Sequence, residues 1–119
     1  MSANYQASRP LKFRVWDGRE MHYFPDLTEW DVEDYSEFSR LIHQGCKVMQ
    51  FTGVMDAFGE SEIYEGDKIL HGCFEFVVEY DDTGACFYLS PIGDTIAPET
   101  FEDGLNFISG HIYDGRKGA

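Results

Sequence analysis

The chain has 119 residues and a mass of 13.7 kDa, a size that corresponds to a single domain. Hydrophobic residues make up 43% of the sequence and aromatic residues 16%, which excludes disorder over most of the length. Nine basic residues against 22 acidic ones give a formal net charge of −13, which opposes nonspecific binding to nucleic acids and to anionic membranes.

The first predicted strand is a short segment in which apolar and basic residues alternate. Leu11, Phe13 and Val15 occupy one face of this segment, and Lys12 and Arg14 occupy the other. A period of two is typical of a strand with one dry face. We therefore expect the apolar side chains to point inward and the two basic side chains to point to solvent.

Residues 28–44 are the one segment with helical periodicity. Apolar side chains recur near helical spacing at Trp30, Tyr35, Phe38, Leu41 and Ile42. Thr28 and Asp31 have the spacing of a capping box, and Gly45 fits the position that ends a helix. Acidic residues gather in the N-terminal half, where the helix dipole favours them. The sequence therefore predicts one principal helix near 28–44.

From residue 46 onward, the pattern is that of strands and tight turns. Predicted strands cover residues 47–52, 63–64, 68–70, 74–81, 85–89 and 106–113. The clearest of them is 74–81, where Glu75, Glu79 and Asp81 alternate with aromatic and aliphatic residues. The sequence thus predicts a mostly β, barrel-like α+β fold in a single domain over residues 11–114. We expect residues 1–10 to be a flexible N-terminus and residues 115–119 to be a tail.

Four segments, taken together and in this order, resemble the YopX-like family of small proteins from temperate phages and prophages. They are Leu11 to Asp17, Val48 to Gly53, Asp56 to Gly59 with Ile63 to Ile69, and Ser109 to Tyr113. The resemblance implies the mostly β, barrel-like fold, a phage or prophage origin and expression in the bacterial cytoplasm. It does not imply a particular catalytic activity. Residues 20–45 are far more acidic than the family pattern.

Side-chain patterns that carry chemistry are absent from the sequence. His71 and Cys73 are the only His/Cys pair separated by a single residue, which is not a zinc-binding pattern. The three cysteines lack the partner pattern of a nucleophile, and no phosphate-binding glycine loop is present. We expect the acids at residues 79–82 to be solvated rather than to hold a cation. The sequence therefore predicts no enzyme, no cofactor and no metal site.

Basic residues are concentrated near the two ends of the chain. Six of the nine Lys and Arg residues lie there, at Arg9, Lys12, Arg14, Arg19, Arg116 and Lys117. They would form one small patch if the first and last strands were neighbours. Because this patch is weak beside the net charge of −13, we expect no direct binding to nucleic acid. No apolar run is long enough to cross a bilayer, so we expect no membrane contact.

Negative charge dominates residues 21–115, where 20 acids face only Arg40, Lys47 and Lys68. Because opposite potentials attract, we expect a protein partner, a host factor that is more basic than acidic. The predicted partner-binding residues are Glu29, Asp31, Glu33, Asp34, Glu75, Glu79 and Asp81.

Three alternatives accompany this hypothesis. The acids could imitate DNA and inhibit a host DNA-binding or anti-phage defence protein, because same-face strand residues repeat at about 6.6 Å, about twice the spacing of phosphates along one strand. The chain could instead be an uncharacterised enzyme or a small-ligand-binding module. In addition, aromatic strands in a small barrel leave edges that need cover, so we expect a homo-oligomer.

Overall fold

The computed structural model describes residues 10–93, 97–101 and 106–114, and it confirms a mostly β fold with one α-helix among these residues. The elements are β1 (Phe13–Trp16), β2 (Met21–Tyr23), a 3-10 turn η1 (Leu27–Glu29), α1 (Val32–His43), β3 (Lys47–Met55), β4 (Glu62–Tyr64), β5 (Asp67–His71), β6 (Phe74–Asp81), β7 (Cys86–Pro91), β8 (Glu99–Thr100) and β9 (Phe107–His111). The predicted tail and all but Pro10 of the predicted flexible N-terminus lie outside the described residues.

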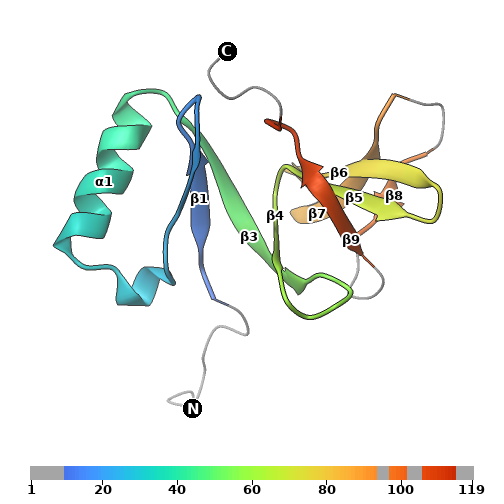
Figure 1. Cartoon of the computed structure of the whole chain (residues 1–119), viewed down its shortest axis with the longest axis horizontal. Coiled ribbons are helices and arrows are strands. Elements are labelled where there is room, and N and C mark those ends of the chain that lie inside the picture. The colour runs from blue at the N-terminus through green and yellow to red at the C-terminus, as the bar shows by residue number, and fades with distance from the viewer. Residues whose placement is uncertain (1–9, 94–96, 102–105, 115–119) are drawn as a thin grey trace.

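The strands form two antiparallel sheets, which correspond to the expected barrel-like arrangement (Figure 1). The first sheet has the order β2-β1-β3-β4, and the second has the order β8-β7-β6-β5-β9. The chain crosses from the first sheet to the second at Glu65 and Gly66, between β4 and β5. Helix α1 lies on the far side of the first sheet from the second sheet (Figure 1). The described helices are too short and too polar to span a lipid bilayer.

Two hydrophobic cores hold these layers together. Between α1 and the first sheet, Val15, Phe24 and Leu41 are buried, with partly buried Trp30 and Phe38 packed against them. The core of the second sheet consists of Ile63, Ile69, Phe76, Val78 and Leu89. Each core is small, so the contact region between the two sheets also has to stabilise the fold.

The helix begins four residues later than the sequence predicts. Asp31, not Thr28, is the N-cap, and its carboxylate accepts a 2.9 Å hydrogen bond from the Asp34 N–H. The Asp34 carboxylate accepts the Asp31 N–H in return, which completes a capping box. Thr28 belongs to η1, where Asp26 accepts its N–H. The helix therefore starts at the second of two consecutive caps.

The predicted side-chain orientations in and next to β1 are wrong at two positions. Val15 is fully buried toward α1, as predicted, but Leu11 is 41% exposed and Arg14 is only 2% exposed. Because α1 covers one face of the first sheet and the second sheet covers the other, neither face of β1 meets solvent. An alternating pattern normally indicates that one face of the strand meets solvent. Here the second sheet buries Arg14, the basic side chain on that face.

Candidate functional site

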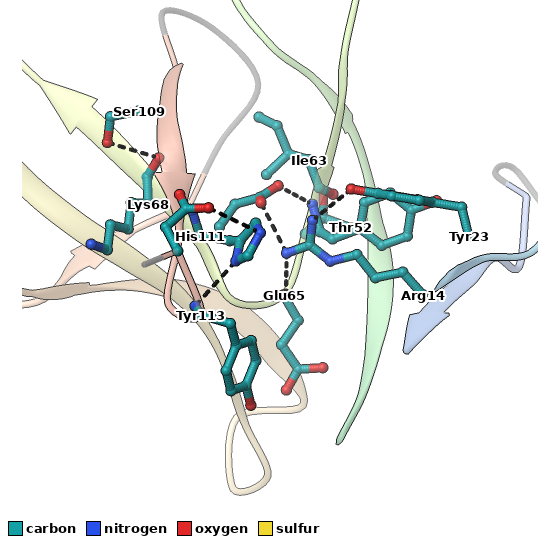
Figure 2. Close-up of polar contacts among 12 residues, drawn as sticks. Arg14, Tyr23, Thr52, Ile63, Glu65, Lys68, Ser109, His111 and Tyr113 are labelled. Carbon is teal, nitrogen blue, oxygen red and sulfur yellow. Dashed lines mark hydrogen bonds and ion pairs between the residues drawn. The ribbon is translucent and has the colours of Figure 1, made fainter. Parts of the chain in front are cut away.

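A buried ion pair joins the two sheets where the chain crosses between them. The Nη2 atom of Arg14 lies 2.9 Å from Oδ1 of Asp67, and the two side chains are 3% and 4% exposed. The same Nη2 atom donates a 3.1 Å hydrogen bond to the main-chain oxygen of Glu65 (Figure 2). The guanidinium carbon also lies 4.9 Å from the centre of the Tyr64 ring. Arg14 therefore ties β1 to the Tyr64–Asp67 turn of the chain.

Asp67 has two roles at this junction. Its Oδ2 atom accepts a 2.8 Å hydrogen bond from the Tyr64 N–H, the turn-capping role that the sequence favours for this residue. Burial raises the pKa of Asp67, although the Arg14 guanidinium and the Tyr64 N–H oppose that rise. The Nε atom of Arg14 is buried without a hydrogen-bond partner among the described residues. The interactions of the pair thus offset only part of the free-energy cost of removing its two charges from water.

The four segments that carry the family resemblance meet at this junction. Arg14 comes from the first segment and Asp67 from the third. The Thr52 hydroxyl of the second segment donates a 2.7 Å hydrogen bond to the Ile63 main-chain oxygen of the third. The Trp16 ring stacks on Tyr113 of the fourth segment, with centroids 5.2 Å apart and planes 7° from parallel. The Arg14–Asp67 and Trp16–Tyr113 contacts therefore join the first sheet to the segments of the second, while the Thr52–Ile63 bond joins β3 to β4 within the first sheet.

Gly66 makes a close approach at the centre of the junction. Its φ of +91° is a left-handed conformation, and an added Cβ would lie 2.9 Å from the Met49 sulfur. Its main-chain oxygen accepts the Ile112 N–H at 3.0 Å. A side chain here would therefore disturb both the backbone angle and the packing between the sheets.

We expect Gly66→Ala to destabilise the fold by about 2–3 kcal/mol, from left-handed backbone strain plus the displacement of buried Met49. Gly59→Ala is the matched control, because Gly59 has a φ of +70° and nothing within 4 Å of an added Cβ. The control should lose only about 1–2 kcal/mol. Urea unfolding of both variants measures the difference, and equal losses would show that the contact with Met49 costs nothing.

The predicted partner-binding acids fall into two separate groups. The helix group contains Glu29 in η1 and Asp31, Glu33 and Asp34 at the start of α1, while the strand group contains Glu75, Glu79 and Asp81 on β6. Figure 1 places α1 and β6 in different parts of the molecule, with the first sheet beside α1 and β6 in the second sheet. The structure therefore does not join the seven acids into one surface.

Within the helix group, two acids build the helix and two do not. Asp31 and Asp34 form the capping box described above. Glu29 and Glu33 are exposed, and their side chains make no hydrogen bond with another described residue. Two exposed apolar side chains lie in the first turn of α1, Val32 at 79% and Tyr35 at 55% exposure. The helical spacing included Tyr35 in the apolar face of the helix, but its ring is more than half exposed, and Val32 gave no periodic signal.

The strand group is bound into local hydrogen bonds. Glu75 accepts the Ser109 hydroxyl at 2.6 Å, and Glu79 accepts the Tyr88 hydroxyl at 2.9 Å. Asp81 accepts the N–H of Thr83 and closes the turn between β6 and β7. Val77 lies between Glu75 and Glu79 on the same face, so it interrupts the row of charges.

None of the seven acids forms an ion pair with another described residue, because the described cations are paired elsewhere or lie apart. Lys12 pairs with Glu62, Arg14 with Asp67, and Arg40 with Glu37 at 2.6 Å. The pairing of Lys12 and Arg14 also removes two members of the basic patch considered from the sequence. No described cation therefore neutralises the helix group or the strand group.

The structure brings together one cluster that sequence spacing did not single out. Side-chain atoms of Asp17, Glu20 and His22 that could bind a metal ion lie within 4.8 Å of one another. The three residues lie at the tight turn between β1 and β2. The Asp17 carboxylate accepts the N–H groups of Arg19 and Glu20 and lies 2.7 Å from His22 Nε2. These internal hydrogen bonds explain the geometry of the cluster as a closed turn. Asp17 is followed by Gly18, a residue pair typical of tight turns, and this pair is the sequence feature from which the turn could have been predicted.

The hydrogen bond from His22, followed by those from the Glu20 and Arg19 N–H groups, lowers the pKa of Asp17 from 3.8 to about 2. We expect His22→Ala to raise this pKa toward 3.8. Because the folded-state value is the lower one, Asp17 stabilises the fold above its unfolded pKa, and this stabilisation disappears as the pH falls toward 2. An NMR titration of the Asp17 carboxyl carbon measures the shift. An unchanged pKa in the variant would mean that the backbone N–H groups alone hold it down.

A comparison with protein families identifies one match. The family described as YopX protein matches residues 12–116, which is most of the chain. A search of curated proteins finds no match. The family match confirms the resemblance drawn from the four segments, and the structure shows that these segments form the junction between the sheets.

Proposed function

The chain belongs to the YopX protein family, and on that premise we propose that it is an accessory protein of a temperate phage or prophage. It works in the bacterial cytoplasm by binding a host protein rather than by catalysis. The partner is basic, because a chain with a net charge of −13 attracts positive surfaces and repels acidic ones.

The observation that carries this proposal is the surface at the start of α1. There, the charges of Glu29, Glu33 and the two capping acids are not neutralised by any described cation. Exposed Val32 and Tyr35 lie among these acids, and the Tyr35 ring is held edge-on to Trp30 at 5.1 Å. Protein interfaces combine such apolar anchors with charges that steer the partner.

Each component of this surface has a separate role in binding. The acids raise the rate of encounter with a basic partner, and salt weakens this effect. Val32 and Tyr35 supply apolar area that leaves water on contact, which lowers the rate of dissociation. A rigid anchor such as Tyr35, fixed against Trp30, loses little conformational freedom on binding.

A DNA-mimicking inhibitor is the narrower form of the same proposal. The row of acids on β6 favours it, because Glu79 and Asp81 occupy the same face of one strand at the spacing of alternate phosphates. In that case, the strand group would make the contact, and duplex DNA would displace the partner.

Affinity capture from a bacterial lysate at low and high salt tests the proposal. The bait proteins are the wild type, Glu29→Lys/Glu33→Lys and the matched control Glu75→Lys/Glu79→Lys, which reverses the same number of charges on β6. We expect the wild type and the control to retain one basic protein at low salt and the helix variant to lose it. Competition with duplex DNA is measured in parallel.

Two results would count against this assignment. If the control loses the captured protein and the helix variant keeps it, binding uses β6, and displacement by DNA would then favour the mimic. If all three baits retain the same proteins at both salt concentrations, the acids do not select the partner.

A further inference from the structure

A groove runs between the two sheets, along β3. One cavity of about 400 Å³ separates Lys47–Met49 of β3 from Val77–Tyr80 of β6. A second cavity of about 300 Å³ continues along β3 to Val54. Tyr80 lines both cavities, so they are neighbours. At about 3.3 Å per residue, the stretch from Lys47 to Val54 is roughly 23 Å long, which suits an extended peptide of about six residues.

This groove is bordered on both sides by strand edges that have no neighbouring strand. β3 pairs with β1 over Lys47–Gln50 on one edge, but its opposite edge pairs with β4 only from Phe51 onward. β6 pairs with β7 as far as Asp81, whereas β5 covers the other edge only as far as Val77. Within the described residues, the ends of β3 and β6 that face the groove therefore each lack a partner strand. Because Gln50 is already bonded to Glu65 and Val78 to Gly66, the edge positions open to a peptide are Val48 on β3 and Tyr80 on β6.

The turn between the sheets explains why these edges are open. The Glu65 N–H donates to Gln50 and the Gly66 N–H donates to Val78, at 2.9 and 2.8 Å. At this point the chain leaves β3 and joins β6, so it can follow neither strand further. The open edges are thus a consequence of the same junction that the Arg14–Asp67 pair stabilises.

The side chains of the groove are apolar with a surplus of negative charge. Met49, Val78 and Ile112 supply aliphatic surface, and Tyr80 and Tyr113 supply aromatic surface. Glu65 and Glu79 provide two carboxylates against the single cation Lys47. With the net charge of −13, this lining disfavours an acidic ligand and favours apolar side chains that alternate with Lys or Arg.

We propose that this groove binds an extended, basic and apolar peptide segment of a partner protein by strand addition. The peptide main chain pairs with the open edge of β3 or β6, its apolar side chains contact Tyr80 and Met49, and its cations lie beside Glu65 and Glu79. This site is separate from the surface at the start of α1, so either one can fail without the other.

The experiment is a titration of isotope-labelled protein with the capped peptide Lys-Val-Lys-Val-Lys-Val, followed by amide chemical shifts. We expect the largest shifts at Lys47–Gln50 and at Glu79–Asp81. The same peptide with N-methyl groups on alternate amides cannot form the strand pairing, and it should bind at least tenfold more weakly. A Glu-Val repeat should not bind.

Matched protein variants test the charges in the groove. Glu65→Gln/Glu79→Gln keeps the hydrogen-bond acceptors for Gln50 and Tyr88 and should weaken peptide binding at least tenfold. Glu60→Gln/Asp82→Asn removes the same charge from exposed positions outside the groove and outside the start of α1, and it should change binding less than twofold. No binding at about 1 mM peptide, equal binding of the N-methylated peptide, or equal weakening by both variants would overturn the proposal.

Discussion

Asp67→Asn should destabilise the fold by about 3–5 kcal/mol, because it leaves the Arg14 guanidinium buried without a counter-charge. Asparagine keeps an oxygen that can accept the Tyr64 N–H, so the loss reports on the ion pair and not on the turn. Arg14 cannot give up its proton, and its side chain is 3% exposed. The folded variant therefore contains an unpaired buried charge, which lowers its free energy of unfolding. Urea unfolding measures the loss.

The double variant Arg14→Met/Asp67→Asn isolates the interaction. It removes both charges and fills the space of the Arg14 stem with an apolar side chain, so it should be at least about 2 kcal/mol more stable than the sum of the two single changes predicts. Removing the unsatisfied Nε atom of Arg14 adds to this recovery. Additive losses would contradict the account, because they would show that Arg14 and Asp67 stabilise the junction independently.

The pH dependence of the single variants gives a second readout of the same pair. Burial raises the pKa of Asp67, and the Arg14 guanidinium opposes that rise. Without Arg14, the ionised carboxylate is buried unpaired and costs stability at pH values above its folded-state pKa, and this cost is relieved as the pH falls through it. Arg14→Met removes the guanidinium that opposes the rise. We therefore expect Arg14→Met to regain stability relative to the wild type at mildly acidic pH, and Asp67→Asn to show no such recovery.

Glu29→Lys/Glu33→Lys should weaken binding to the purified captured partner by about 10- to 100-fold at low salt. The two reversals change the surface charge by four units, and exposed charge pairs each contribute about 0.2–1 kcal/mol. Because the side chains of Glu29 and Glu33 make no hydrogen bond with another described residue, the variant should lose only the favourable interaction of Glu33 with the helix dipole, about 1 kcal/mol. Titration calorimetry at two salt concentrations measures the effect.

Val32→Ala/Tyr35→Ala is the companion variant, because it removes the exposed apolar anchors and leaves the acids in place. We expect it to weaken binding through faster dissociation, with the salt dependence of the wild type. If the charge reversal has no effect on binding and the removal of Val32 and Tyr35 abolishes it, the acids only solubilise the protein.

Much of the fold was predictable because most strands show a period of two and α1 shows helical spacing. The strand at 74–81 matches β6 at both ends, because Phe76 and Val78 meet a core while Glu79 meets solvent. The start of the helix was not predictable from a single capping pattern. Asp26 and Asp31 are two caps in succession, and only their backbone angles decide which of them begins α1.

The inner role of Arg14 could not be derived from local pattern. Its partner Asp67 is more than fifty positions away, and an alternating strand with basic residues on one face normally has that face in water. Only the packing of the second sheet onto the first makes both faces of β1 internal. The sequence identified Arg14 and Asp67 within the family segments but contained no local sign that they touch.

The candidate sites were predictable as lists of residues but not as surfaces. The acids at the start of α1 and on β6 were identified from composition and periodicity, and their separation on two elements depends on the order of the strands in the two sheets. The groove along β3 was not predictable, because it arises where Glu65 and Gly66 carry the chain from one sheet to the other.

The most direct test of the central claim is amide hydrogen exchange of the protein, free and bound to its captured partner. If the start of α1 is the binding surface, the partner should slow exchange in residues 29–36 and leave the outer face of β6 unchanged. Protection confined to the second sheet, with exchange in α1 unaltered, would contradict the account.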